Sequence, residues 1–233
     1  MVSVDFRFNL KGDIDNWWDA CNSSFMGNDW KMWIRPDLRE KIVGVRKDKA
    51  ERFLRPYLEG VYKREGKHVL KMIGVSKRYW DENETEIYSR LSKITKKPIW
   101  PPIIHCYYTT FPRCPYGFKK NEGWLYINKK FAKNKKEYAG TVLHELMHFQ
   151  FHKYFWGYCK KHGLSDAQIN HLKEAFTFLI NEEFSDIVSR DNGYRIHKML
   201  RKDLSKIWKK SNNFRITLDG GILLMKRKYH NLD

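Results

Sequence analysis

The chain has 233 residues, 42% of them hydrophobic and 15% aromatic, with a formal net charge of +18. This composition excludes a disordered chain, and the length can bury a core as one domain or as a catalytic domain with a smaller lobe. No apolar run approaches a membrane span and the first residues do not resemble a signal peptide, so we expect a cytoplasmic protein without a membrane span. The four cysteines form no Cys-x-x-Cys pair, which favours reduced thiols, although Cys106 and Cys114 could face each other across a hairpin.

Residues 1–97 are expected to form an N-terminal strand and a helical, Trp-rich region packed on the core. Apolar and polar residues alternate over residues 2–10, which predicts a half-buried strand ending at Gly12. The Trp-rich segment 13–35 is predicted to be irregular or short helical, with its indoles in the core. Helices are predicted from Pro36, over 47–63 and over 81–96.

Residues 98–233 are expected to form the catalytic region, and they open with prolines and a pair of strands. The strands are predicted at 103–111 and 123–128, separated by a turn that contains Pro112, Pro115 and Gly117. Together with the N-terminal strand they predict an α+β fold with a small mixed or antiparallel sheet.

Helices dominate the rest of the chain. A helix is predicted from about Tyr138 to the stop signal at His162-Gly163, where a basic last turn precedes a glycine. Ser165 and Gln168 form a capping box that starts the next helix, which is predicted to run to about Arg190. A third helix is predicted over 194–210, and a closing hairpin over 215–225 around Asp219-Gly220-Gly221.

The most informative segment is His144-Glu145-Leu146-Met147-His148. On a helix the two histidines lie four residues apart and share one face, so they can bind one metal ion. Buried imidazoles and carboxylates are costly unless they are paired or bound to metal, and the apolar flanks predict burial. His144 and His148 are therefore candidate zinc ligands, and Glu145 is the candidate general base that accepts a proton from water.

The segment resembles the zincin metallopeptidases, whose signature is HExxH on an active-site helix. The resemblance implies a zincin-like fold, a Zn2+ cofactor and hydrolysis of a peptide or protein substrate. One subclass takes its third ligand from HExxHxxGxxH, but Phe151 and Tyr154 stand where that motif needs Gly and His. The chain is more similar to the gluzincins, whose third ligand is a glutamate on the following helix.

Two glutamates of that helix are candidates for the third ligand. Asn181-Glu182-Glu183-Phe184-Ser185-Asp186 is similar to the gluzincin N-E-x-x-S-D pattern, in which Glu182 would bind zinc and Asp186 would orient a ligand histidine. Glu174 lies among apolar neighbours and is the second candidate. A straight motif helix favours Glu182, whereas a break at Gly157 favours Glu174. One of the two is expected to complete the site.

Further candidates concern the transition state and the substrate. Tyr194 and His197 follow the Asp-Asn-Gly turn and are candidate donors to the oxyanion. The strands at 103–111 and 124–128 are candidates for a sheet edge that pairs with an extended substrate.

The positive charge suggests a different class of function. Basic residues are denser over 119–136 and 201–210, so nucleic acid is a possible partner through a basic surface. HExxH followed by His162-Gly163 also looks like the DNA-dependent proteases of the SprT type, with His162 as the third ligand. The remaining alternative is a nucleic-acid-associated protein whose zinc site is non-catalytic.

Overall fold

The computed structural model describes the chain except residues 1, 23, 26–27, 129–133 and 233. The fold is α+β, with a small mixed sheet, as expected. The chain forms two compact units, one of Ser3–Arg78 with Ile103–Tyr138, and one of Tyr79–Pro102 with Ala139–Asp233 and Val2. The long helix α3 (Lys47–Thr95) and helix α4 (Lys135–Tyr154) each contribute residues to both units.

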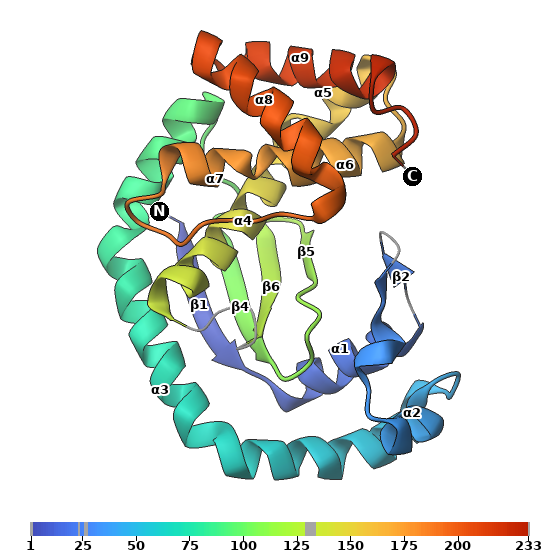
Figure 1. Ribbon diagram of the computed structural model, residues 1–233. Coiled ribbons are helices and arrows are strands. Elements are labelled where there is room, and N and C mark those ends of the chain that lie inside the picture. Colours follow the sequence, from blue (N-terminus) through green and yellow to red (C-terminus); the bar gives the residue numbers. More distant parts are fainter. Residues whose placement is uncertain (1, 23, 26–27, 129–133, 233) are drawn as a thin grey trace. The chain divides into compact units, whose positions relative to one another are not determined.

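The first unit contains a four-stranded sheet in the order β1-β4-β6-β5 (Figure 1). β1 (Ser3–Phe8) and β6 (Glu122–Asn128) run parallel to β4 (Ile103–Thr109), whereas β5 (Tyr116–Lys119) runs antiparallel to β6. β4 and β6 are both interior strands of this sheet. The expectation that β4 offers a free edge to substrate is therefore wrong, because it pairs with β1 over residues 103–108 and with β6 over Ile103–Thr109. β6 pairs with β5 from Glu122 to Leu125, so the edge expected at 124–128 is covered in its first part.

Helices α1 (Leu10–Asn22) and α2 (Pro36–Ile42) and the first part of α3 build the apolar core of the same unit. A 3-10 turn (Trp30–Trp33) and the short strands β2 (Ser24–Phe25) and β3 (Asn28–Asp29) lie between α1 and α2. Trp17 is buried in this core as expected, but Trp33 is 52% exposed. Asp13 is fully buried in α1 and accepts hydrogen bonds from Thr109 and Thr110, which fixes α1 to the end of β4.

The second unit is helical in the part that the structure describes. It holds the end of α3 and most of α4, followed by α5 (Trp156–Lys161), α6 (Asp166–Phe176), α7 (Phe178–Glu183), the 3-10 turn η2 (Arg195–His197), α8 (Lys198–Ser211) and α9 (Phe214–Arg227). The predicted capping box is present, because Ser165 Oγ accepts from Gln168 N while Gln168 Oε1 accepts from Ser165 N. The predicted stop is also present, since α5 ends before His162 and Gly163 has a φ of +80°.

Four predictions about secondary structure differ from the structure. Residues 47–63 and 81–96 belong to one continuous helix, and Gly12 lies inside α1 rather than at a strand end. The helix predicted over 165–190 is divided at Thr177 and ends at Glu183. The predicted closing hairpin is wrong, because residues 215–225 lie within α9. No helix in the described ranges is long and apolar enough to cross a membrane.

Candidate metal centre

Helix α4 brings the two histidines of the motif together. Asn134 starts the helix by accepting hydrogen bonds at Oδ1 from the backbone N–H groups of Lys136 and Glu137. Leu143 and Leu146 are fully buried and hold the motif turn against the core. The rings of His144 and His148 lie 4.4 Å apart between centroids, in an edge-to-face arrangement. The spacing of four residues thus produces the shared face that the sequence predicts.

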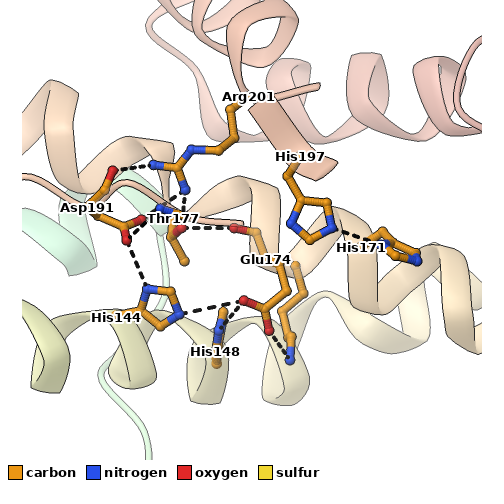
Figure 2. Close-up of polar contacts among 10 residues, drawn as sticks. His144, His148, His171, Glu174, Thr177, Asp191, His197 and Arg201 are labelled. Carbon is orange, nitrogen blue, oxygen red and sulfur yellow. Dashed lines mark hydrogen bonds and ion pairs between the residues drawn. The ribbon is translucent and has the colours of Figure 1, made fainter. Parts of the chain in front are cut away.

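Glu174 of α6 meets this histidine pair (Figure 2). Its Oε2 lies 3.2 Å from His148 Nε2 and 3.6 Å from His144 Nε2. The three candidate ligand atoms all lie within 4.8 Å of one another. Zinc bonds of about 2.0–2.1 Å at tetrahedral angles place ligand atoms about 3.3 Å apart. The donor set and its spacing therefore fit a metal ion of zinc's size and preference.

The chain has a helix break between α4 and α5, and Glu174 is the glutamate that meets the histidine pair. α4 ends at Tyr154 and α5 starts at Trp156, so the interruption is at Phe155, two residues before Gly157. From the sequence, a helix break at Gly157 favours Glu174 over Glu182 as the third ligand. The structure has both the helix break and the contact of Glu174 with the histidines, and the break lies two residues earlier than expected.

Glu182 lies elsewhere on the same helical segment. Its Oε1 accepts a hydrogen bond from Ser205 Oγ at 2.7 Å, and its Oε2 lies 3.3 Å from Lys209 Nζ. It therefore joins α7 to α8 and is not a member of the metal-ligand cluster that the described residues form.

Glu145 is buried next to the ligands, with 6% of its surface exposed. Its Oε2 has no hydrogen-bond partner among the described residues. Burial raises the pKa of Glu145 to about 7, opposed by His144 and assisted by the negative charge of Glu174. An unsatisfied buried carboxylate oxygen is costly, so no stabilising contact of Oε2 within the described residues explains its place beside the candidate ligands.

Burial and two nearby carboxylates shift the pKa values of the two histidines in opposite directions. Burial lowers the pKa of His148 to about 3, which keeps this imidazole neutral and available as a ligand. Burial also opposes the charge on His144, but Asp191 and Glu174 outweigh it and raise the pKa of His144 well above its ordinary value. Two carboxylates thus favour positive charge at this point, which a divalent cation would also supply.

Asp191 supports His144 from the side away from Glu174 (Figure 2). Its Oδ1 lies 3.5 Å from His144 Nδ1, and its Oδ2 accepts a hydrogen bond from Arg201 at 2.9 Å. Asn181 fixes the backbone of Asp191 in both directions, donating to its carbonyl and accepting from its N–H. Such a carboxylate orients a ligand histidine so that its Nε2 faces the metal.

The turn after Asp191 fits this arrangement. Gly193 has a φ of +58°, and a Cβ at this position would lie 2.6 Å from Arg201 Nη1. Arg201 is almost buried and also donates to Thr177 Oγ1, at the break between α6 and α7. The Asp-Asn-Gly segment was interpreted from the sequence only as a turn, so the role of Asp191 was missed. Its signal, an acidic residue before a glycine turn, has no specific link to a metal site.

Lys173 is the second charged neighbour that the sequence analysis missed. It is 2% exposed, and its Nζ lies 3.1 Å from Glu174 Oε1, the oxygen that does not face His148. His148, His144 and Lys173 together outweigh the effect of burial and hold the pKa of Glu174 well below its ordinary value. Glu174 is therefore ionised, with one oxygen paired to Lys173 and the other facing the histidines.

The remaining candidate residues do not belong to the metal-ligand cluster found among the described residues, and each has other partners. Asp186, expected to orient a ligand histidine, instead forms a two-pronged ion pair with Arg90 at 2.8 Å. His197 is fully buried, and its Nε2 lies 2.8 Å from His171 Nδ1. Tyr194 is 36% exposed and its ring lies 5.8 Å from that of His197. His162, the alternative third ligand, bonds through Nδ1 to the carbonyl of Tyr158.

Comparison with known proteins adds no assignment. No family model, curated protein or solved structure matches this chain.

Proposed function

We propose that the protein is a zinc-dependent metallopeptidase of the zincin type, most similar in its ligand set to the gluzincins. The observation that carries the proposal is the cluster of His144, His148 and Glu174, with the two histidine–carboxylate distances of 3.2 and 3.6 Å. Three protein ligands leave one position open, which is the arrangement of catalytic zinc sites, whereas structural sites are closed by four protein ligands.

Zinc in such a site acidifies water and polarises a substrate carbonyl. The chain's own contribution begins with Glu145, which accepts a proton from the attacking water as the carbon–oxygen bond forms. Glu145 then gives that proton to the amide nitrogen as the carbon–nitrogen bond breaks, so that carboxylate and amine products result. Its buried position next to the candidate ligands and the free Oε2 among the described residues suit both steps.

Asp191 and Lys173 act on the ligands rather than on the substrate. Asp191 holds the ring of His144 in orientation, and Lys173 holds one oxygen of Glu174 so that the other faces the histidines. His144 is the most accessible ligand, with 20% of its side chain exposed, whereas His148 is 1% exposed. Substrate therefore approaches from the His144 side of the cluster.

The test is to compare Glu145→Gln with wild-type protein after loading with zinc. The exchange keeps the side chain's shape and removes the base, so zinc content and melting temperature stay near wild type. Hydrolysis of an unfolded protein substrate is expected to fall by roughly 10²–10⁴-fold. Glu82→Gln, an exposed glutamate of α3, is the matched control and should leave the rate unchanged. Equal rates for Glu145→Gln and wild type would exclude Glu145 as the base.

A further inference from the structure

The helical unit contains a cavity of about 510 Å³ that is separate from the metal-ligand cluster. Its walls come from the end of α3, the break before α5, the ends of α7 and α8, and the start of α9. None of His144, His148 and Glu174 lines it. A cavity of this volume is in the range of sites that hold a small molecule or part of a larger ligand.

The charge of the cavity lining is strongly positive. The basic residues that line it are Lys93, Lys96, Lys97 and Arg215. The single acidic lining residue, Glu183, already accepts a hydrogen bond from the indole N–H of Trp208 at 2.6 Å. This leaves an excess of cations around a hollow, which favours an anionic ligand with more than one charge.

Most of these cations are available to a ligand. Lys93 and Lys96 are exposed, and within the described ranges neither has an ion pair or hydrogen bond. Lys97 lies over the ring of Tyr154 at 5.8 Å, a contact that leaves its ammonium accessible. Arg215 is already engaged, because its guanidinium lies 3.5 Å over the ring of Tyr158 and 3.4 Å from Asp219, although both side chains of that ion pair are about half exposed.

Aromatic and amide groups line the same cavity. Phe155, Trp208 and Phe214 form apolar wall, and Asn212 adds an exposed amide. The N-terminus of α9 does not add free donors of its own, because Asn213 Oδ1 already accepts from the N–H groups of Arg215 and Ile216. Phe155, Trp208 and Phe214 are buried, so the groups that a ligand can reach are the lysines and the amide, which bind phosphate oxygens.

We propose that this cavity binds phosphate groups, carried either by a free nucleotide or by a segment of single-stranded nucleic acid. The proposal is independent of the metal centre, because the two sites share no residue. The net charge of +18 would attract polyanions to many parts of the surface. The specific claim is that lysines of the cavity contribute more to the binding affinity than the same number of exposed lysines elsewhere.

The experiment uses the full chain and two probes, a fluorescent adenine nucleotide and a fluorescent single-stranded oligonucleotide, at 50–200 mM salt. The test variant is Lys93→Ala with Lys96→Ala. The control is Lys67→Ala with Lys71→Ala, two exposed lysines of α3 that do not line the cavity. Each double variant removes the same charge, so non-specific attraction falls equally in both.

We expect the test variant to weaken binding of at least one probe by about 10-fold or more, with a shallower salt dependence, and the control to weaken it by less than about 3-fold. Loss confined to the nucleotide identifies a free nucleotide as the source of the phosphate, and loss for the oligonucleotide identifies a nucleic-acid strand. Equal losses in the two variants, absence of binding by the wild type, or equal affinity for an acidic peptide would overturn the proposal. Zinc content, measured in parallel, should be unchanged in both variants.

Discussion

The variant Glu174→Gln tests which of two glutamates, Glu174 or Glu182, is the third metal ligand, a choice that the sequence alone does not decide. Glutamine keeps the shape of the side chain but removes the charge that faces His148 at 3.2 Å and His144 at 3.6 Å. Loss of a partner behind a metal ligand typically costs about 10–100-fold in metal affinity, and loss of a ligand charge should cost at least as much as the upper figure. Glu174→Gln is therefore expected to weaken zinc binding by at least ~100-fold, or about 2.7 kcal/mol.

The same change also disturbs a buried ion pair. Lys173 Nζ lies 3.1 Å from Glu174 Oε1 and its side chain is 1% exposed, so removing the carboxylate charge should lower the free energy of unfolding by about 3–5 kcal/mol. A Glu174→Gln variant that fails to fold would not report on zinc. The double variant Lys173→Met with Glu174→Gln removes both charges and should recover most of the stability without recovering zinc affinity.

Glu182→Gln is the matched control. Its contacts are with Ser205 and with Lys209, which is 64% exposed, so the change should cost no more than about 1 kcal/mol of stability. Competition with a chromophoric zinc chelator measures affinity, and thermal unfolding of the metal-free proteins measures stability. Wild-type zinc affinity in the folded double variant, or a large loss of affinity in Glu182→Gln, would refute the assignment of Glu174.

Three other changes test further parts of the structure. Asp191→Asn should weaken zinc binding of the folded protein by about 10–100-fold, because the carboxylate at 3.5 Å orients His144; unchanged affinity in the same competition assay would contradict this. The change also removes the charge that pairs with the buried Arg201, so it should lower the free energy of unfolding as well. Asp13→Ala should lower the free energy of unfolding in urea by about 2–4 kcal/mol, because it leaves buried hydroxyl groups without their acceptor, and a loss below about 0.5 kcal/mol would count against that network. A thiol reagent at pH 8 should modify one cysteine promptly in the folded protein and all four after unfolding. The prompt one should be Cys114, which is half-buried, whereas the other three are buried and burial raises the pKa of Cys21 to about 11. Prompt modification of two or more cysteines would contradict the described burial.

The local signals for the metal centre were readable from the sequence, because they depend on residues close together in the chain. The i, i+4 histidines, the capping box at Ser165 and the glycine stop at Gly163 are each contained within a few residues. The third ligand is different, because its position depends on the angle and length of two helices. The breaks at Phe155 and Thr177 decide which glutamate meets the pair, and neither residue is a strong helix breaker.

The error at residues 215–225 has a physical cause in packing. Asp219-Gly220-Gly221 is typical of a turn, but both glycines lie inside α9 where neighbouring side chains come close. A Cβ on Gly220 would lie 2.7 Å from Ile207 Cδ1, and one on Gly221 would lie 2.9 Å from Leu172 Cδ1. These glycines therefore allow close helix packing rather than a reversal of the chain, and only the tertiary contacts distinguish the two uses.

The role of Asp191 could not be predicted for a similar reason. Its contact with His144 joins residues 47 positions apart, through a segment that Asn181 and Arg201 hold in place. The N-E-x-x-S-D pattern predicts Glu182 and Asp186 for the site. In the structure the carboxylate next to His144 is that of Asp191, and Asp186 pairs with Arg90.

The most direct test of the account is a crystal structure of the zinc-loaded protein with anomalous scattering measured at the zinc edge. We expect one zinc per chain, about 2.0–2.2 Å from Nε2 of His144, Nε2 of His148 and a carboxylate oxygen of Glu174, with water in the remaining position. Glu145 should face that water without binding the metal. A peak away from these residues, or a fourth protein side chain in the water position, would contradict the proposed catalytic site.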